Sequence, residues 1–266
     1  MTEPALSRDE WPEEPDVSHL VTEDDTPVEN WFQGKEMYLL TDVLDASWPE
    51  GRPFVSGADV GVFCAVREAI VPDMLLSKGV DYPANYHEKG RRSYFTWVFG
   101  KPPDVVVEIV SNRTGGEDTE KLKSYAEMRV PYYVIHDPFR LLSSRPLRIF
   151  QLSGASYIEK VDRFLPDIGL GFTLWEGEFD GLRGEWLRWV DPQGRLLETG
   201  KERSLRAERE AEGERQRAEE ERQRAELERE RAEREAQRRE RMEQKLRQLG
   251  IDPDEPDGPI GGTGSS

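Results

Sequence analysis

The sequence lacks several features that mark common classes of protein. It contains one cysteine, Cys64, among 266 residues, so no internal disulfide can form and a reducing compartment is expected. Cys64 lies in the apolar run 60–66, where we expect a buried small hydrophobic side chain. No apolar stretch approaches the length of a membrane span, and the acidic first residues lack the apolar core of a secretory signal. These absences favour a cytoplasmic protein that does not associate with membranes.

Several catalytic and binding motifs are also missing. The sequence contains no glycine-rich phosphate loop, no zinc-ligand spacing and no nucleophile elbow. His87 and His136 are not spaced as metal ligands, and we interpret both as ordinary polar residues. A net charge of −17 excludes broad, non-specific binding of nucleic acids through a basic surface. A nucleic-acid function must therefore depend on a local site or on a metal ion.

The composition changes along the chain and divides it into four segments. Residues 1–27 are acidic and contain four prolines, so we expect a flexible N-terminus. Residues 28–199 have the composition of a folded domain. Residues 200–249 hold 16 Lys and Arg against 15 Asp and Glu, with no aromatic residue and no proline, which predicts a charged helix. Residues 250–266 should be disordered.

The charged segment has alanine at every seventh position, but it forms a poor coiled-coil seam. A stable coiled coil needs two large apolar positions per heptad, and the partner positions here are mostly glutamate. The segment can persist as a single helix supported by Glu–Arg pairs four residues apart. Alternatively, it can pair weakly near Met242, Leu246 and Leu249, which would make the protein a homo-oligomer through this helix.

Patterns of apolar residues predict an α/β domain with a mixed sheet flanked by helices. Helices are expected at 35–47 and 118–129. Strands are expected at 59–66, 68–76, 104–110, 131–136, 147–152 and 157–161, with a further hairpin at 187–197. We expect the first two strands to form a hairpin across Arg67, and residues 77–102 to form a long irregular connection. The right-handed crossover rule makes strands 104–110 and 131–136 parallel neighbours.

One acidic residue interrupts the most apolar of these strands. Glu108 lies within the segment DVVVEIV, and a buried carboxylate costs several kcal/mol unless a cation or hydrogen bonds compensate. Lys121 follows in the first turns of the next helix and shares a helix face with Tyr125, whereas Lys123 points away towards solvent. Lys121 is therefore the expected partner of Glu108, and a buried structural ion pair is the simpler alternative to a functional site.

A second acid near Glu108 would complete a metal site. Asp104 lies on the same strand face, but four residues along a strand span roughly 13 Å, which is too far for one ion. It is better explained as a strand-start or turn residue. Asp73 in VPDMLLS can approach from a neighbouring strand. Asp73 and Glu108 then supply oxygen ligands for Mg²⁺, or for Mn²⁺ as a substitute, and Lys121 assists an attacking water.

These segments resemble a known family. The strings VPDMLLS, PPDVVVEIVS and the block from Asp118 to Pro138 are similar to the Uma2 family of restriction endonucleases, a branch of the PD-(D/E)XK nuclease superfamily. The resemblance spans roughly residues 22–254 and implies a restriction-endonuclease-like fold, DNA as the partner, and Asp73, Glu108 and Lys121 as the catalytic set. In the superfamily the lysine normally follows the acid by two residues, but that position is Val110 here. The resemblance implies that Lys121 replaces it.

Other polar residues have weaker functional interpretations. The assignment of an auxiliary helix carboxylate to Glu36 or Glu29 is much weaker, and Asp118 is expected to cap or charge the following helix. A basic cluster beside Tyr94 and Trp97 could grip phosphates or stack on bases, or could simply be a solvated loop; it consists of Lys89, Arg91 and Arg92. The sequence thus predicts a Mg²⁺-dependent DNA endonuclease, with a catalytically silent nuclease-like fold that binds partners through its C-terminal helix as the alternative.

Overall fold

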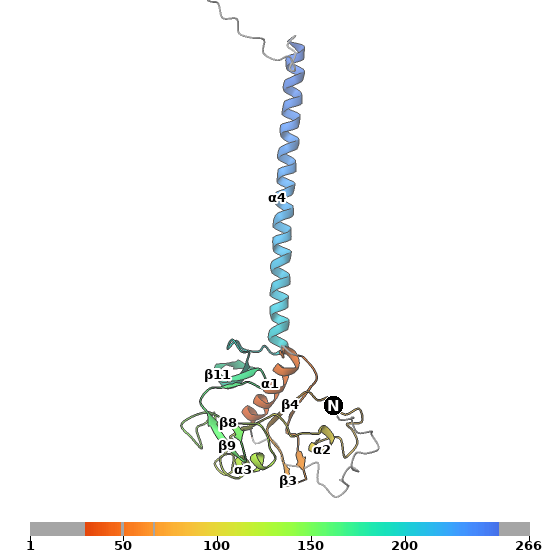
Figure 1. The fold of residues 1–266 in the computed structure, drawn as a ribbon. Coiled ribbons are helices and arrows are strands. Elements are labelled where there is room, and N and C mark those ends of the chain that lie inside the picture. The colour runs from red at the N-terminus through yellow and green to blue at the C-terminus, as the bar shows by residue number, and fades with distance from the viewer. Residues whose placement is uncertain (1–29, 49–50, 66, 250–266) are drawn as a thin grey trace, which may run out of the picture. The chain divides into compact units, whose positions relative to one another are not determined.

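The computed structural model describes residues 30–48, 51–65 and 67–249. The chain divides into two compact units, 1–203 and 204–266. The described part of the first unit is a mixed α/β fold, as the sequence predicts (Figure 1). The predictions for the flexible ends, 1–27 and 250–266, and for Glu29 lie outside the described residues.

The first unit is built on a six-stranded mixed sheet with strand order β1-β4-β6-β7-β8-β9. Its strands are β1 (Phe54–Ala58), β4 (Met74–Lys78), β6 (Val105–Ile109), β7 (Tyr132–His136), β8 (Leu147–Ser153) and β9 (Ser156–Lys160). Strands β6 and β7 are parallel, while the other neighbours are antiparallel. The parallel pair joined by helix α3 (Glu120–Glu127) and the β8–β9 hairpin are both confirmed predictions.

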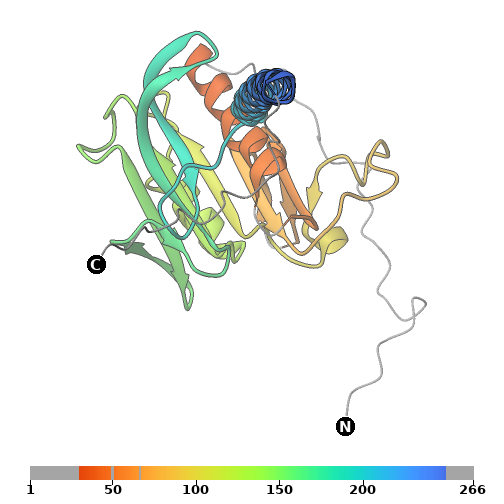
Figure 2. The same cartoon turned by 90° about the horizontal axis from the view of Figure 1, so that it is seen from above.

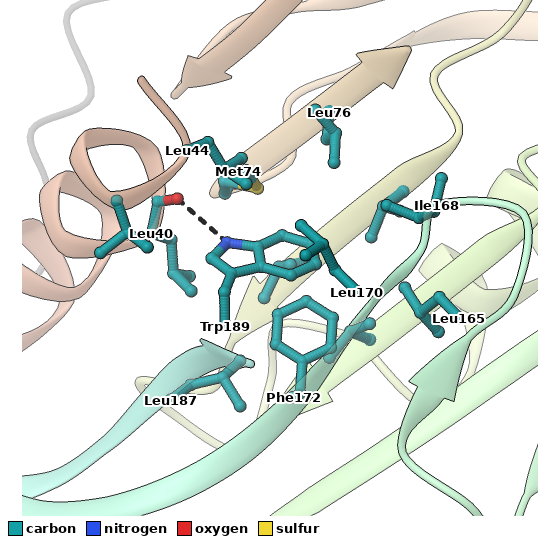
Figure 3. Close-up of a cluster of buried hydrophobic side chains, with 14 of the residues drawn as sticks. Leu40, Leu44, Met74, Leu76, Leu165, Ile168, Leu170, Phe172, Leu187 and Trp189 are labelled. Atoms are coloured by element: carbon teal, nitrogen blue, oxygen red, sulfur yellow. Dashed lines mark hydrogen bonds between the residues drawn. The ribbon is translucent and has the colours of Figure 1, made fainter. Parts of the chain in front are cut away.

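One face of this sheet is covered by helix α1 (Trp31–Ser47) and by a second sheet of β10 (Phe164–Leu165), β11 (Leu170–Phe179) and β12 (Leu182–Val190). Figure 2 shows α1 lying beside the curved β11–β12 ribbon. At the centre of this layer, the indole of Trp189 packs 3.9 Å from the ring of Phe172, measured between ring centroids. Its Nε1–H donates to the carbonyl oxygen of Leu40 at 3.0 Å (Figure 3). This core fixes α1 against the strands.

The opposite face carries α3 and a small sheet of β3 (Arg67–Ile70), β2 (Val62–Cys64) and β5 (Tyr94–Phe95), followed by the short helix α2 (Thr96–Phe99). Alternation along the strands sends side chains to the two faces in turn. Val105 and Val107 of β6 therefore join the core below α1, whereas Val106 points to the α3 side. Glu108 has the same parity as Val106 and so faces α3.

Helix α1 and two strand pairings differ from the prediction. The helix begins at Trp31 rather than at residue 35, because the Asn30 side chain caps it by accepting from the Gln33 amide at 2.9 Å. Segment 68–76 is not one strand: Pro72, which lacks a backbone donor, separates β3 from β4. β3 pairs with β2 in the predicted hairpin, but Arg67 begins β3 and pairs with Cys64 instead of lying in the turn, and β4 pairs with the unpredicted β1.

The hairpin predicted at 187–197 is also wrong. β12 pairs along its whole length with β11, through the two-residue turn Asp180–Gly181. Both turn residues have positive φ, 48° and 83°, as the tight turns of β-hairpins require. The turn at 191–194 exists, but it leads only to a single bridge between Val190 and Leu196. Cys64, expected to be buried, is partly exposed.

The described part of the second unit consists of helix α4 (Gly200–Gln248), which begins within the last residues of the first unit. This long charged helix confirms the prediction. It has no buried residue, and pairs four residues apart, such as Arg206–Glu210 and Glu230–Arg234, lie along its surface. Each such pair contributes only a few tenths of a kcal/mol to the helix. Oligomerisation through α4 stays a prediction.

Candidate active site

Glu108 is a buried carboxyl with two hydrogen-bond donors. Its side chain is 1% exposed. Oε2 accepts from Lys121 Nζ at 2.8 Å, and Oε1 accepts from the hydroxyl of Tyr125 at 2.6 Å. Both donors lie on one face of α3, as residues four apart in a helix must. The crossover from β6 through α3 therefore supplies both groups that compensate the buried acid.

Lys121 and Lys123 have different surroundings, although both belong to α3. Lys121 is partly buried and bridges Glu108 to a second carboxylate, with Nζ 3.6 Å from Oε1 of Glu117. Lys123 is exposed, in agreement with the prediction. The two lysines therefore form a matched pair on one helix, and only Lys121 contacts the acidic groups.

Asp73 reaches the same edge of the sheet from a different strand. It directly precedes β4, where Met74 pairs with Val107 of β6, so that Asp73 lies next to Glu108 in the register. Its Oδ2 accepts from the backbone amide of Ile109 at 2.6 Å. The structure thus brings the three predicted site residues together, although Asp73 and Lys121 are far apart in sequence.

Burial sets the electrostatics of this cluster. It raises the pKa of Glu108 to about 8, against the opposing charge of Lys121, and the charge of Asp73 adds to the increase. It also raises the pKa of Asp73, although the Ile109 amide and Gln33 oppose this. Burial alone would lower the pKa of Lys121, but the neighbouring Glu108 outweighs it and the pKa lies above the usual value. Burial thus favours the protonated form of Glu108, whereas Lys121 and Tyr125, which both donate to it, favour the ionised carboxylate.

A third acid, Glu117, was not predicted to belong to the site. It is 5% exposed, and its Oε2 is buried without a hydrogen-bond partner among the described residues. Its carboxylate folds back over Gly115, where an added Cβ would lie only 2.0 Å from Oε1. A side chain at position 115 would therefore displace the Glu117 carboxylate from this position. The sequence showed only a polar turn here, and nothing in it indicated the direction of the Glu117 side chain.

Helix α1 adds a neutral donor that sequence reasoning also missed. Nε2 of Gln33 donates to Oδ1 of Asp73 at 2.8 Å, so the two oxygens of Asp73 are each held by one hydrogen bond. A signal for this residue was available: asparagine followed three positions later by glutamine marks a helix start. Extending the helix back to Trp31 would have placed Gln33 on the same side as the core residues.

Glu36 and His136 form a separate buried pair on the α1 side of the sheet. Glu36 Oε1 accepts from the Leu187 amide at 2.6 Å, and its Oε2 lies 3.3 Å from Nδ1 of His136. Both side chains are fully buried. His136 was predicted to be an ordinary polar residue, but it is fully buried against Glu36. Glu36 contacts β12 and His136, and it does not contact Asp73 or Glu108.

The remaining candidates lie outside the cluster. Asp104 accepts from the Lys78 amide at 2.7 Å and from Lys101 Nζ at 2.6 Å, which is the expected role of a strand-start residue. Asp118 does not cap α3, whose N-cap is Thr119; instead it lies 3.4 Å from Arg148. The prediction of a cap is therefore wrong.

The chemistry of the donor set fits a hard divalent cation. Among the described residues, no three Asp, Glu, His or Cys side chains form a complete set of metal ligands. Mg²⁺ does not need one, because it usually keeps several waters and binds to one or two carboxylates. The carboxylate oxygens of Asp73 and Glu108 each keep an unused lone pair, and the unpartnered Oε2 of Glu117 lies at the same site.

Fold and cluster together define an α/β protein with a carboxylate–lysine site at one edge of a mixed sheet. The sequence matches the model of the Uma2 family, described as "Putative restriction endonuclease", over residues 9–167. This match covers more than half of the chain and includes Asp73, Glu108 and Lys121, so the protein belongs to the Uma2 family. No curated protein matches the chain. Within the described residues, no helix is long and apolar enough to cross a membrane.

Proposed function

We propose that the protein is a Mg²⁺-dependent endonuclease that hydrolyses phosphodiester bonds in DNA, with Mn²⁺ as a substitute metal. The observation that supports this most is the meeting of Asp73, Glu108 and Lys121 at one sheet edge in a chain of the Uma2 family. Two carboxylates and an ammonium group are the parts that metal-assisted hydrolysis of a phosphodiester needs. The family's description makes DNA the expected substrate.

Each residue has a distinct role in this proposal. Asp73 and Glu108 would hold the metal ion, which would lower the pKa of a bound water and neutralise charge on the phosphate. Lys121, relieved of Glu108 when that carboxylate binds a cation, would orient the water and stabilise negative charge on the phosphate oxygens. Tyr125 holds the Glu108 carboxyl in place, and Gln33 does the same for Asp73.

One observation supports a second candidate, a nuclease-like fold that binds partners through α4 without cutting. Lys121 and Tyr125 already satisfy Glu108 in the manner of a structural ion pair. A buried pair of this kind can be retained for structural reasons alone. Deleting residues 204–266 distinguishes the two, because an assembly module would lose its partner whereas a nuclease would keep its chemistry.

The direct test compares Lys121→Met with Lys123→Met in plasmid cleavage with Mg²⁺ and with Mn²⁺. Lys121→Met should lower the rate at least about a hundredfold, as removal of a group that stabilises the transition state typically does. Lys123→Met should cleave as the wild type does, because Lys123 is exposed on the same helix. Circular dichroism of both variants checks that the fold is intact.

Two results would contradict the proposal. If the folded Lys121→Met variant cuts as fast as Lys123→Met, Lys121 has no role in catalysis. If the wild type binds neither metal in isothermal titration and leaves the plasmid intact, the cluster is a structural ion pair and the second candidate stands. Asp73→Asn provides an independent check, since it removes one metal ligand while keeping the shape of the side chain.

A further inference from the structure

A pocket of about 480 Å³ lies beside the candidate active site. Its lining includes Leu75 of β4, which pairs with Val106, two residues before Glu108 on the same strand face. Two residues along a strand span roughly 7 Å. The pocket and the carboxylates are therefore on the same side of the sheet, close enough for one DNA strand to contact both. The volume falls in the range that accommodates a small organic ligand.

Aromatic rings supply much of the pocket wall. Tyr94 and Phe99 stack on each other with a centroid distance of 4.2 Å and an angle of 6° between the ring planes. Tyr82 and Tyr86, from the connection before β5, are 48% and 65% exposed. Flat rings that remain accessible in a pocket are suited to stacking against another flat ring.

Two of the rings, those of Tyr82 and Tyr94, are held in place by hydrogen bonds within the fold. The hydroxyl of Tyr82 donates to the carbonyl of Ser56 on β1 at 2.6 Å. The hydroxyl of Tyr94 lies 2.9 Å from Oγ of Ser77. Because its hydroxyl already has a partner in the fold, Tyr82 offers its ring rather than its polar end, whereas Tyr94, 1% exposed and stacked on Phe99, only supports the pocket wall. Recognition in the pocket should therefore depend on stacking more than on the hydrogen-bonding edge of the ligand.

The charge of the pocket narrows the class of ligand. Arg91 and Arg92 belong to the lining and add positive charge to the aromatic wall, although each also makes a further interaction within the chain. A flat aromatic ligand carrying an anionic group satisfies both features, and a nucleotide is such a ligand.

From these features we infer that the pocket binds a single unstacked nucleobase of the DNA strand next to the cleavage site, with Tyr82 and Tyr86 stacking on the base and the two arginines facing its phosphate. This inference rests on the proposed function for the identity of the polymer. A base enters such a pocket only from a single strand or after leaving the duplex stack. Stacking is tolerant of sequence, so thymine and adenine should bind within a few-fold of each other.

Binding can be measured without cleavage. Fluorescence anisotropy in EDTA would follow the full-length protein with a short labelled thymidine oligonucleotide and with an abasic strand of the same length and charge. We expect the base-bearing strand to bind about tenfold more tightly, and Tyr86→Ala to remove that advantage. Tyr38→Ala is the matched control, because Tyr38 is 57% exposed on α1 and does not line the pocket. Tyr82→Phe should keep most of the affinity, since it keeps the ring.

The outcomes separate this inference from the nuclease proposal. Equal binding of the abasic and base-bearing strands, unchanged binding by Tyr86→Ala, or no DNA binding at all would overturn the nucleobase pocket. Loss of binding in Tyr86→Ala without cleavage by the wild type under Mg²⁺ would leave the pocket in place and remove the nuclease. Cleavage by the wild type together with normal oligonucleotide binding by Tyr86→Ala would remove the nucleobase pocket and leave the nuclease proposal in place.

Discussion

The buried carboxyl of Glu108 should make the folded protein less stable as the pH rises. Burial raises its pKa to about 8, whereas the ordinary value expected in the unfolded chain is 4.5. Between these two values the folded state holds a proton that the unfolded state has lost. Stability linked to Glu108 is therefore fully present below pH 4.5 and is lost as the pH rises through 8. Glu108→Gln removes this titration and nearly preserves the side-chain shape.

The size of the effect follows from the pKa difference. One proton bound only by the folded state gives a slope of about 1.4 kcal/mol per pH unit. Relative to Glu108→Gln, the wild type should therefore lose on the order of 2 to 3 kcal/mol of unfolding free energy between pH 5 and pH 7. Asp73, whose pKa is also raised, remains in both proteins and largely cancels in the comparison. Lys121 titrates above this window because its pKa lies above 10.5.

Urea unfolding, followed by tryptophan fluorescence in EDTA at several pH values, would measure this difference. Glu120→Gln is the matched control, because Glu120 is an exposed acid in the first turn of α3. Its stability should follow the wild type across the whole range. Parallel curves for the wild type and Glu108→Gln would refute the reasoning, since they would show that the Glu108 carboxyl titrates alike in the folded and unfolded states.

Three further predictions concern the metal, the core and the start of α4. Mg²⁺ affinity should rise about tenfold per pH unit up to a pH of about 8 and then level off, because the metal must displace the proton of Glu108. Isothermal titration at several pH values would measure this rise, and Glu108→Gln should lose this pH dependence. Trp189→Phe should lower the free energy of unfolding in urea by about 1 to 3 kcal/mol, because it leaves a gap and removes the hydrogen bond to the Leu40 carbonyl. Trp31→Phe should change the free energy of unfolding little, because Trp31 is 84% exposed. Glu202→Gln should lower the melting temperature, because it removes the charged partner of the buried Arg188 guanidinium at 2.8 Å, and the exposed Glu208→Gln should not.

The parts of the fold that follow from local pattern could be predicted from the sequence. The run VVVEI is apolar on both faces, so a central strand was the expected result, and the short connection through α3 made its neighbour parallel. Glu108 stood out because it is the one charged residue in that run. Lys121 followed from the short return from β6 into α3 and from helix geometry, since it shares a face with Tyr125.

Strand pairing was harder to predict because it depends on contacts between distant segments. The strand FVSGA of β1 is short and its apolar residues do not alternate, so no local signal identified it. It pairs with β4, the part of the predicted strand 68–76 that follows Pro72. The β11–β12 turn was different: Asp180–Gly181 is a strong local hairpin signal, and it was overlooked in favour of the turn at 191–194.

Asp73 carries most of the argument that this cluster is more than a structural ion pair. Glu108 has all the compensation that a buried acid needs from Lys121 and Tyr125. A second carboxylate beside it makes the pair less favourable, because the charge of Asp73 raises the pKa of Glu108 further. A fold that required only stability would gain by replacing Asp73 with a neutral residue, yet the Ile109 amide and Gln33 both hold it in place. A divalent cation bound between them would reverse that balance, because both carboxylates would attract it at once.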